Sequence, residues 1–186
     1  MKNNKGFTLV ELLAMLVVLG ILMAVTIPNM SGILGNTRLN KTKNDATQII
    51  EIAKTRVARD AAISKPKNKE CLILTLNFLD DNEEFTNGAS EGLYQQYDSF
   101  VLYTREGSRY KYYLRLVETK DGKNTGLPLI ESTEIDSLKN SDIKTIDALY
   151  DLSNNRQTSI ESLKEKAEIT AKCDQDKISY YVHRES

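Results

Sequence analysis

The most apolar part of the chain lies near its start. Residues 9–27 contain one charged side chain, Glu11. As an α-helix this segment would be about 28 Å long at roughly 1.5 Å per residue, close to the roughly 30 Å hydrocarbon thickness of a bilayer. Lys2 and Lys5 precede it, and basic residues favour the cytoplasmic side of a membrane. The pattern predicts one membrane-spanning helix, with the rest of the chain exported.

Two alternatives to this interpretation are a cleaved secretory signal and an ordinary signal anchor. A secretory signal has an apolar region of about 7–15 residues with small residues at its cleavage site, whereas here the apolar run is longer and Pro28-Asn29-Met30-Ser31 follow it. A signal anchor leaves the carboxylate of Glu11 unexplained, because an intramembrane carboxylate costs about 2.5–3.5 kcal/mol on insertion scales and usually has a function.

A second helical pattern, amphipathic this time, covers residues 37–63. Its apolar side chains recur at spacings of three and four and so share one face of a helix: Ala46, Ile49, Ile50, Ala53, Val57 and Ala61. The basic residues lie mostly off that face, and Pro66 predicts an end to the helix. We expect this segment to continue the apolar helix and to pack on a globular domain.

Strand patterns are clearest in residues 99–119. Two runs, 100–104 and 110–117, flank a turn that contains Gly107. Polar and apolar side chains alternate in the second run, which predicts an antiparallel hairpin with one buried face.

Shorter patterns complete the expected domain. Residues 71–79 predict a strand, with a short helix as the alternative, and residues 178–182 predict a final strand. Residues 82–92 and 120–126 are typical of loops. We expect helices at 141–152 and 159–171, the second one with Thr158 and Glu161 at the spacing of a capping box.

Together these elements predict an α+β fold. A long N-terminal helix, with a transmembrane half and an amphipathic half, would pack on an antiparallel sheet of about three to four strands with extra short helices.

Composition and charge add one feature to this picture. The 186 residues are 40% hydrophobic with a formal net charge of −1, which excludes an acidic disordered tail and a disulfide-dense mini-protein and argues against a general nucleic-acid binder. The charges are segregated along the chain. Residues 12–37 carry none, residues 38–70 carry nine basic and four acidic side chains, and residues 71–186 have a net negative charge. Opposite charges on a neck and a body would favour head-to-tail packing of subunits.

Residues that could support catalysis or ligand binding are few. His183 is the sole histidine and no Gly-rich phosphate loop occurs, so we expect neither an enzyme nor a cofactor. Residues 80–84 are acidic but lack the spacing of a calcium loop, and we expect no metal. Tyrosines beside cations could stack single-stranded DNA, but a Tyr-rich strand in a half-buried sheet is the favoured explanation, and we expect no nucleic acid. These side chains are Tyr110, Lys111, Tyr112, Tyr113 and Arg115.

Cys71 and Cys173 are the two cysteines of the chain. In an exported domain they could form a disulfide, which for a loop of about 100 residues is worth ~4.7 kcal/mol in the chain-entropy model. Two free buried thiols are the alternative.

The segment Lys5-Gly6-Phe7-Thr8-Leu9-Val10-Glu11 closely resembles the processing site of type IV prepilins and the related pseudopilins. The resemblance implies that prepilin peptidase cleaves between Gly6 and Phe7 and N-methylates Phe7. It also implies that Glu11 is the assembly residue, whose carboxylate pairs with the N-terminal amine of a neighbouring subunit. An ammonium and a carboxylate are costly alone in apolar surroundings and tolerable together.

The same resemblance assigns helix-interrupting roles to Gly20 and Pro28, which in pilins bracket a stretch that can unwind when the subunit packs into a filament. Gly and Pro are, however, common in transmembrane helices in general. The implied organisation is a cleaved leader at residues 1–6, a hydrophobic transmembrane and polymerisation helix at 7–30, the amphipathic half of the helix at 31–65 and a globular head at 66–186.

The expected function is therefore that of a non-enzymatic pilus subunit serving adhesion, twitching motility or aggregation. Its expected partners are copies of itself in a helical filament, other pilins, prepilin peptidase and the pilus assembly platform. The precursor would be a single-pass protein of the cytoplasmic membrane, and the mature subunit would lie in an extracellular pilus. A minor pilin or pseudopilin of a secretion or DNA-uptake apparatus is one alternative, and a signal-anchored surface binding protein that never polymerises is another.

Overall fold

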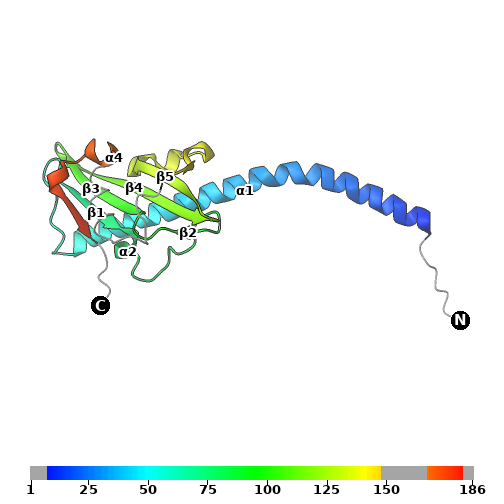
Figure 1. Ribbon diagram of the computed structural model, residues 1–186, viewed down its shortest axis with the longest axis horizontal. Coiled ribbons are helices and arrows are strands. Elements are labelled where there is room, and N and C mark those ends of the chain that lie inside the picture. The colour runs from blue at the N-terminus through cyan, green and yellow to red at the C-terminus, as the bar shows by residue number, and fades with distance from the viewer. Residues whose placement is uncertain (1–7, 148–166, 182–186) are drawn as a thin grey trace. The chain divides into compact units, whose positions relative to one another are not determined.

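The computed structural model describes residues 8–147 and 167–181, without the side chains of residues 25–32. One long helix, α1 (Leu9–Arg59), begins the described chain (Figure 1). The chain divides into two compact units, Met1–Thr37 and Arg38–Ser186. Helix α1 contributes its first part to the first unit and the remainder to the second.

The first unit is helical from Leu9 onward in its described residues. Helix α1 runs unbroken through Gly20 and Pro28, so neither residue interrupts it here, and unwinding on filament packing stays a prediction. None of the helices in the described part of the chain combines the length and the apolar character that crossing a bilayer requires. The transmembrane half of the predicted helix is therefore not confirmed.

The second unit is built around one mixed, mostly antiparallel sheet. In the described residues its strands follow the order β6-β5-β4-β3-β1-β7, with β2 paired to β4. All neighbours are antiparallel except β1 and β7, which are parallel. The strands are β1 (Cys71–Thr75), β2 (Leu93–Tyr94), β3 (Phe100–Glu106), β4 (Arg109–Lys120), β5 (Lys123–Glu131), β6 (Lys144–Thr145) and β7 (Ile178–Tyr181).

Short helical segments connect these strands. They are α2 (Leu76–Leu79), α4 (Ala167–Thr170) and three 3₁₀ segments at Ser132–Ser137, Asn140–Asp142 and Gln175–Lys177. The structure thus confirms the predicted α+β class, a long helix packed on a mostly antiparallel sheet with short helices. The predicted number of strands, about three to four, is wrong, because the sheet in the described residues has seven.

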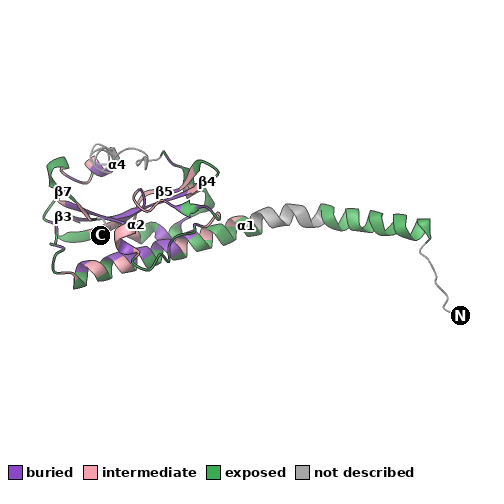
Figure 2. Ribbon diagram, turned by 60° about the horizontal axis from the view of Figure 1, so that its bottom comes forward, coloured by how far each residue is buried: buried purple, intermediate pink, exposed green. Residues whose placement is uncertain are grey.

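The C-terminal part of α1 covers one face of the sheet. Its predicted apolar stripe is buried there from Ala46 to Val57 (Figure 2). Ala61, predicted to belong to the stripe, instead follows the end of the helix and is exposed. The stripe meets the inward side chains of the central strands, among them Leu74, Val101 and Leu114. The helix ends at Arg59, earlier than the sequence pattern suggested.

The opposite face of the sheet is also buried, contrary to the expectation of one buried face for the hairpin. A second apolar cluster contains Ile73, Phe100 and Leu102 from the central strands, covered by Ile169 and Ile178 of the C-terminal segment. Strand β4 therefore has buried residues on both of its sides. Its alternation of polar and apolar residues did not reveal that the C-terminal segment covers the second side.

The edge of the sheet beyond β4 differs from the sequence prediction. Of residues 120–126, expected to form a loop, only Asp121 and Gly122 form a turn, since Lys120 ends β4 and residues 123–126 already belong to β5. Gly126 and Pro128 are typical of loops, yet both lie inside that strand. At Gly126 the strand passes so close to β4 that an added Cβ would lie 2.0 Å from the carbonyl oxygen of Leu116. Only glycine fits there, which explains a glycine within a strand.

Three other local predictions have mixed outcomes. Both alternatives for residues 71–79 occur in succession, as β1 and then α2. The helix expected at 141–152 is wrong for residues 141–147, which contain the end of a 3₁₀ turn and β6, and residues 148–152 lie outside the described residues. Of the helix expected at 159–171, only α4 is described, and Thr158, Glu161 and His183 lie outside the described residues.

Candidate processing and assembly site

The N-terminus of α1 is built around Thr8 and Glu11. Glu11 accepts two hydrogen bonds through Oε2, each 2.8 Å long, from the backbone N–H and from the hydroxyl of Thr8. In return the Glu11 N–H donates to Thr8 Oγ1 at 3.3 Å. This reciprocal pattern is a capping box, with Thr8 at the N-cap and Glu11 three residues later, and it satisfies donors that the first turn of a helix otherwise leaves unpaired.

The capping box holds the carboxylate of Glu11 against Thr8, close to the proposed cleavage site. Cleavage between Gly6 and Phe7 would make Thr8 the second residue, so the Glu11 carboxylate would be bonded one residue from the new N-terminal amine. A carboxylate in the first turn is also favoured by the positive end of the helix dipole. The arrangement can accept a cation or an N–H donor.

Not all predicted site residues fall in the described chain. Gly6 and Phe7 lie outside it, so the geometry of the cleavage site is not described. Gly20 is exposed with no heavy atom within 4 Å of a Cβ built there, and only the backbone of Pro28 is described. Thr8 is a site residue that the sequence analysis missed, although its Thr-x-x-Glu spacing is a recognised signal for a helix start.

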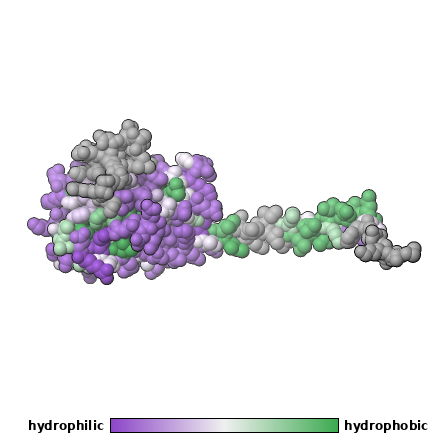
Figure 3. Space-filling model, turned by 90° about the horizontal axis from the view of Figure 1, so that it is seen from below, coloured by the Kyte–Doolittle hydropathy of each residue, from purple (hydrophilic) through white to green (hydrophobic). Residues whose placement is uncertain are grey.

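The surface that follows this cap is apolar on every side. Large apolar side chains from Leu9 to Met23 are between 51% and 80% exposed, and Figure 3 shows hydrophobic residues along this part of α1. A helix that is hydrophobic all round needs an apolar environment on all sides, such as lipid or other apolar helices. The described chain offers no such cover for these residues.

Comparison with known proteins identifies the N-terminal segment. Residues 1–27 match the family model described as the prokaryotic N-terminal methylation motif. This motif is the prepilin signal of type IV pilins and pseudopilins, so the chain carries the signal of a pilin-like precursor. No curated protein and no solved structure matches the chain.

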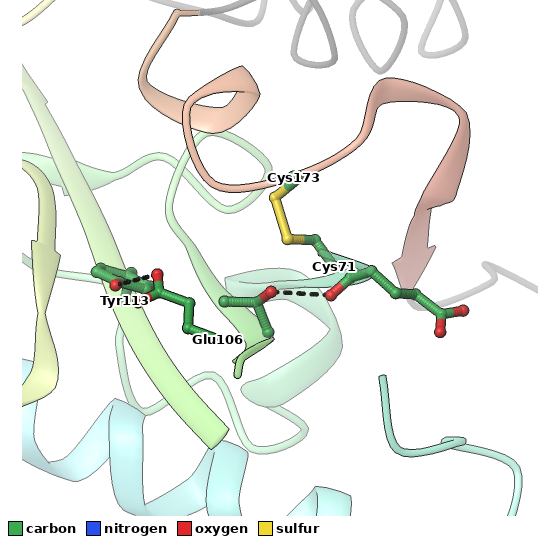
Figure 4. The surroundings of a disulfide bond; sticks show 6 residues. Cys71, Glu106, Tyr113 and Cys173 are labelled. Atoms are coloured by element: carbon green, nitrogen blue, oxygen red, sulfur yellow. Dashed lines mark hydrogen bonds between the residues drawn. A yellow bond between two sulfur atoms is a disulfide. The ribbon is translucent and has the colours of Figure 1, made fainter. Parts of the chain in front are cut away.

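A disulfide joins the start of the sheet to the C-terminal segment (Figure 4). Cys71 opens β1 and Cys173 follows α4, their Cα atoms are 5.8 Å apart and they are separated by 102 positions in the chain. Both residues are buried in the second apolar cluster. The bridge therefore holds the segment that covers the second face of the sheet.

The acidic run at residues 80–84 mainly organises its own loop. Asp80 accepts hydrogen bonds of 2.8 Å from the backbone N–H groups of Glu84 and Phe85, and Asp81 is paired with Arg56 of α1. Within the described residues, no three His, Cys, Asp or Glu side chains are placed to hold a metal ion.

The tyrosines and cations of β4 do not form one surface. Tyr112 packs with the cluster under α1, whereas Tyr113 belongs to the opposite cluster. Lys111 lies 3.1 Å from Glu106 and 3.0 Å from Glu131, and these hydrogen bonds raise its pKa. Arg115 is buried, with its Nε 3.0 Å from a carboxylate oxygen of Asp98. The arrangement does not support a stacking platform for DNA on this strand.

Proposed function

We propose that this chain is the structural subunit of a type IV pilus, processed after Gly6 and polymerised through the N-terminal part of α1. The observation that carries the proposal is the combination at one helix end: a methylation motif, a capped carboxylate at Glu11 and an uncovered apolar surface directly after it. The role is non-enzymatic.

Physical reasons connect these features to assembly. The precursor would rest in the cytoplasmic membrane with residues 7–30 in lipid, where the apolar side chains are covered. In the filament the same side chains would be covered by the helices of neighbouring subunits. Glu11 would set the register, because a buried carboxylate is tolerated only where a cation meets it.

The sharpest test replaces Glu11. We expect Glu11→Ala to leave cleavage and methylation intact and to reduce the yield of sheared filaments by about tenfold or more, in line with the cost of leaving one charge of a buried pair uncompensated. Glu51→Ala is the matched control, since Glu51 is an exposed glutamate of the same helix and forms an exposed ion pair with Lys54. Wild-type filament yield from Glu11→Ala would contradict the assembly role.

The mature N-terminus tests the processing step. Mass spectrometry should find N-methylated Phe7 in the wild type and an intact precursor in a Gly6→Val variant. An intact Met1 in the wild type would instead support a surface protein that is only anchored and never polymerises.

A minor pilin or pseudopilin is the second candidate, because the methylation motif is common to pilins and pseudopilins. Immunogold labelling of sheared filaments separates the two roles. Labelling along the whole filament supports a major subunit serving adhesion, twitching or aggregation. Labelling confined to tips supports a minor subunit.

A further inference from the structure

One end of the head carries an excess of exposed positive charge. It combines the loop that follows α1 with the turn between β3 and β4. The surface that we name the basic tip consists of Lys65, Lys67, Lys69, Arg105 and Arg109. The three lysines and Arg109 are exposed and Arg105 is half-buried.

Backbone contacts bring the two segments of the basic tip together. Asn68 forms a β-bridge with Arg105, and the Lys69 N–H donates to the Arg105 carbonyl at 3.2 Å. The side-chain oxygen of Asn68 accepts from the Gly107 N–H at 3.2 Å. Pro66, between Lys65 and Lys67, is buried and anchors the loop on the head. The exposed lysines therefore extend from an ordered backbone.

Three carboxylates, Glu70, Glu106 and Asp174, lie beside the basic tip and offset part of its charge. Glu106 is engaged by Tyr113 and by Lys111, which is outside the basic tip, and Asp174 pairs with Lys177 at 3.0 Å. Glu70 accepts a hydrogen bond of 2.7 Å from the backbone N–H of Lys67. Within the described chain, Lys65, Lys67, Lys69 and Arg109 form no direct ion pair, although Asp174 interacts electrostatically with Lys69. These four side chains are exposed and can reach an added anion.

We propose that the basic tip binds a flexible polymer of phosphate groups without bases. Single exposed ion pairs contribute little, whereas several cations in a row gain affinity together by releasing the counterions of a polyanion. The guanidinium of Arg109, which forms no ion pair with another described residue, suits phosphate because its planar fork can donate two parallel hydrogen bonds. A repeating anion therefore fits this surface better than a single small ion.

The aromatic residues at this end argue against nucleobases as the recognised groups. Single-stranded nucleic acids stack successive bases on exposed rings. Here Tyr110 is 42% exposed but has the guanidinium of Arg105 5.7 Å from its ring centre. Tyr103 is buried and stacks on Tyr112 with ring centres 4.6 Å apart. One partly covered ring gives no stacking path, so charge is what the surface offers.

The test measures binding of long-chain inorganic polyphosphate to the full-length protein in detergent. The tip variant is Lys65→Gln/Lys67→Gln/Lys69→Asn, with Asn at the last position because Lys69 has a φ of 61°, which Asn tolerates. The matched control is Lys123→Gln/Lys139→Gln/Lys144→Gln, which removes the same charge from exposed lysines elsewhere. An intact Cys71–Cys173 bridge and an unchanged Tm verify the fold, and Arg109→Gln provides an independent tip variant in the turn.

We expect the tip variant to lose about tenfold or more in affinity and the control less than about twofold, with binding weakening steeply between about 50 and about 200 mM salt. Equal losses in both variants, or no binding by the wild type, would overturn the proposal. Tighter binding of polyglutamate would overturn the choice of phosphate. Tighter binding of a single-stranded oligonucleotide with as many phosphates, abolished by Tyr110→Ala, would assign the surface to nucleic acid instead.

Discussion

At the scale of single residues, the Glu11 carboxylate has one set of partners in the described chain and would gain another in the proposed filament. In the free chain it bonds the N–H and hydroxyl of Thr8, and in the proposed filament it would meet the amine of a neighbour. The motif singled out Glu11 from the sequence. The role of Thr8 emerged only once the helix start was located at Leu9, because a capping residue is defined by where the helix begins.

The first prediction concerns Thr8→Val, which removes the hydroxyl and keeps the shape of the side chain. We expect the first turn of α1 to fray, since losing an N-cap costs about 0.5–2 kcal/mol. Amide hydrogen exchange of residues 9–12 in detergent should therefore become faster. Thr37→Val is the control, because the Thr37 hydroxyl bonds to the Ile33 carbonyl inside the helix and caps nothing. Unchanged exchange at residues 9–12 would contradict the capping role.

The second prediction concerns Glu106 on β3. A hydrogen bond of 2.7 Å from the Tyr113 hydroxyl, helped by Lys111, lowers the pKa of Glu106 below its ordinary 4.5. Because the folded pKa is depressed, this contribution to stability is complete above about pH 4.5 and is lost as the pH falls through the folded value.

We expect Tyr113→Phe to remove the main donor and to move the pKa of Glu106 back toward 4.5. An NMR titration of the Glu106 carboxyl carbon measures this directly. Tyr110→Phe is the control, since Tyr110 pairs with Arg105 across the same hairpin and gives Glu106 no such donor. An unchanged titration in Tyr113→Phe would show that Lys111 and Lys172, and not Tyr113, lower the pKa of Glu106.

At the scale of elements, the sequence predicted the helices and strands in which apolar residues recur at one regular spacing. The stripe of α1 and the pair β3 and β4 were foreseeable because spacings of three to four, or of two, place apolar residues on one face. Strand β5 was not, because Gly126 and Pro128 are loop-forming residues whose presence in a strand depends on the neighbouring strand. The second buried face was also missed, because the segment that covers it is distant in sequence.

The third prediction tests that explanation of β5. We expect Gly126→Ala to destabilise the head by about 1–3 kcal/mol, because its Cβ would overlap the Leu116 carbonyl and force β4 and β5 apart. Thermal or denaturant unfolding measures the change. Gly107→Asn is the control: Gly107 has a φ of 61° and open space around it, and Asn accepts that conformation. Equal stability of Gly126→Ala and the wild type would mean that the strands adjust without cost.

At the scale of the whole molecule, the two faces of the sheet are covered by two segments from different parts of the chain. Helix α1 covers one face and is continuous with the sheet domain in sequence, whereas the C-terminal segment returns from far along the chain to cover the other. That segment is attached by the disulfide, by the parallel pairing of β7 with β1 and by a hydrogen bond of 2.9 Å from the Asp174 N–H to the Lys69 carbonyl. Sequence alone left the bridge open, because two cysteines show only that pairing is possible.

The fourth prediction follows from this asymmetry between the two covers. We expect Cys71→Ser/Cys173→Ser to cost about 2–5 kcal/mol, because the bridge restrains a long loop in the unfolded chain. The loss should be uneven: hydrogen exchange should accelerate in α4 and β7 more than in the buried stripe of α1, because α1 keeps its own apolar cluster when the C-terminal segment detaches. The matched comparison is the wild type under reducing conditions, which should show the same pattern without any substitution. Uniform acceleration across both covers would instead mean that the two faces unfold as one unit and that the bridge stabilises the whole head rather than its C-terminal cover.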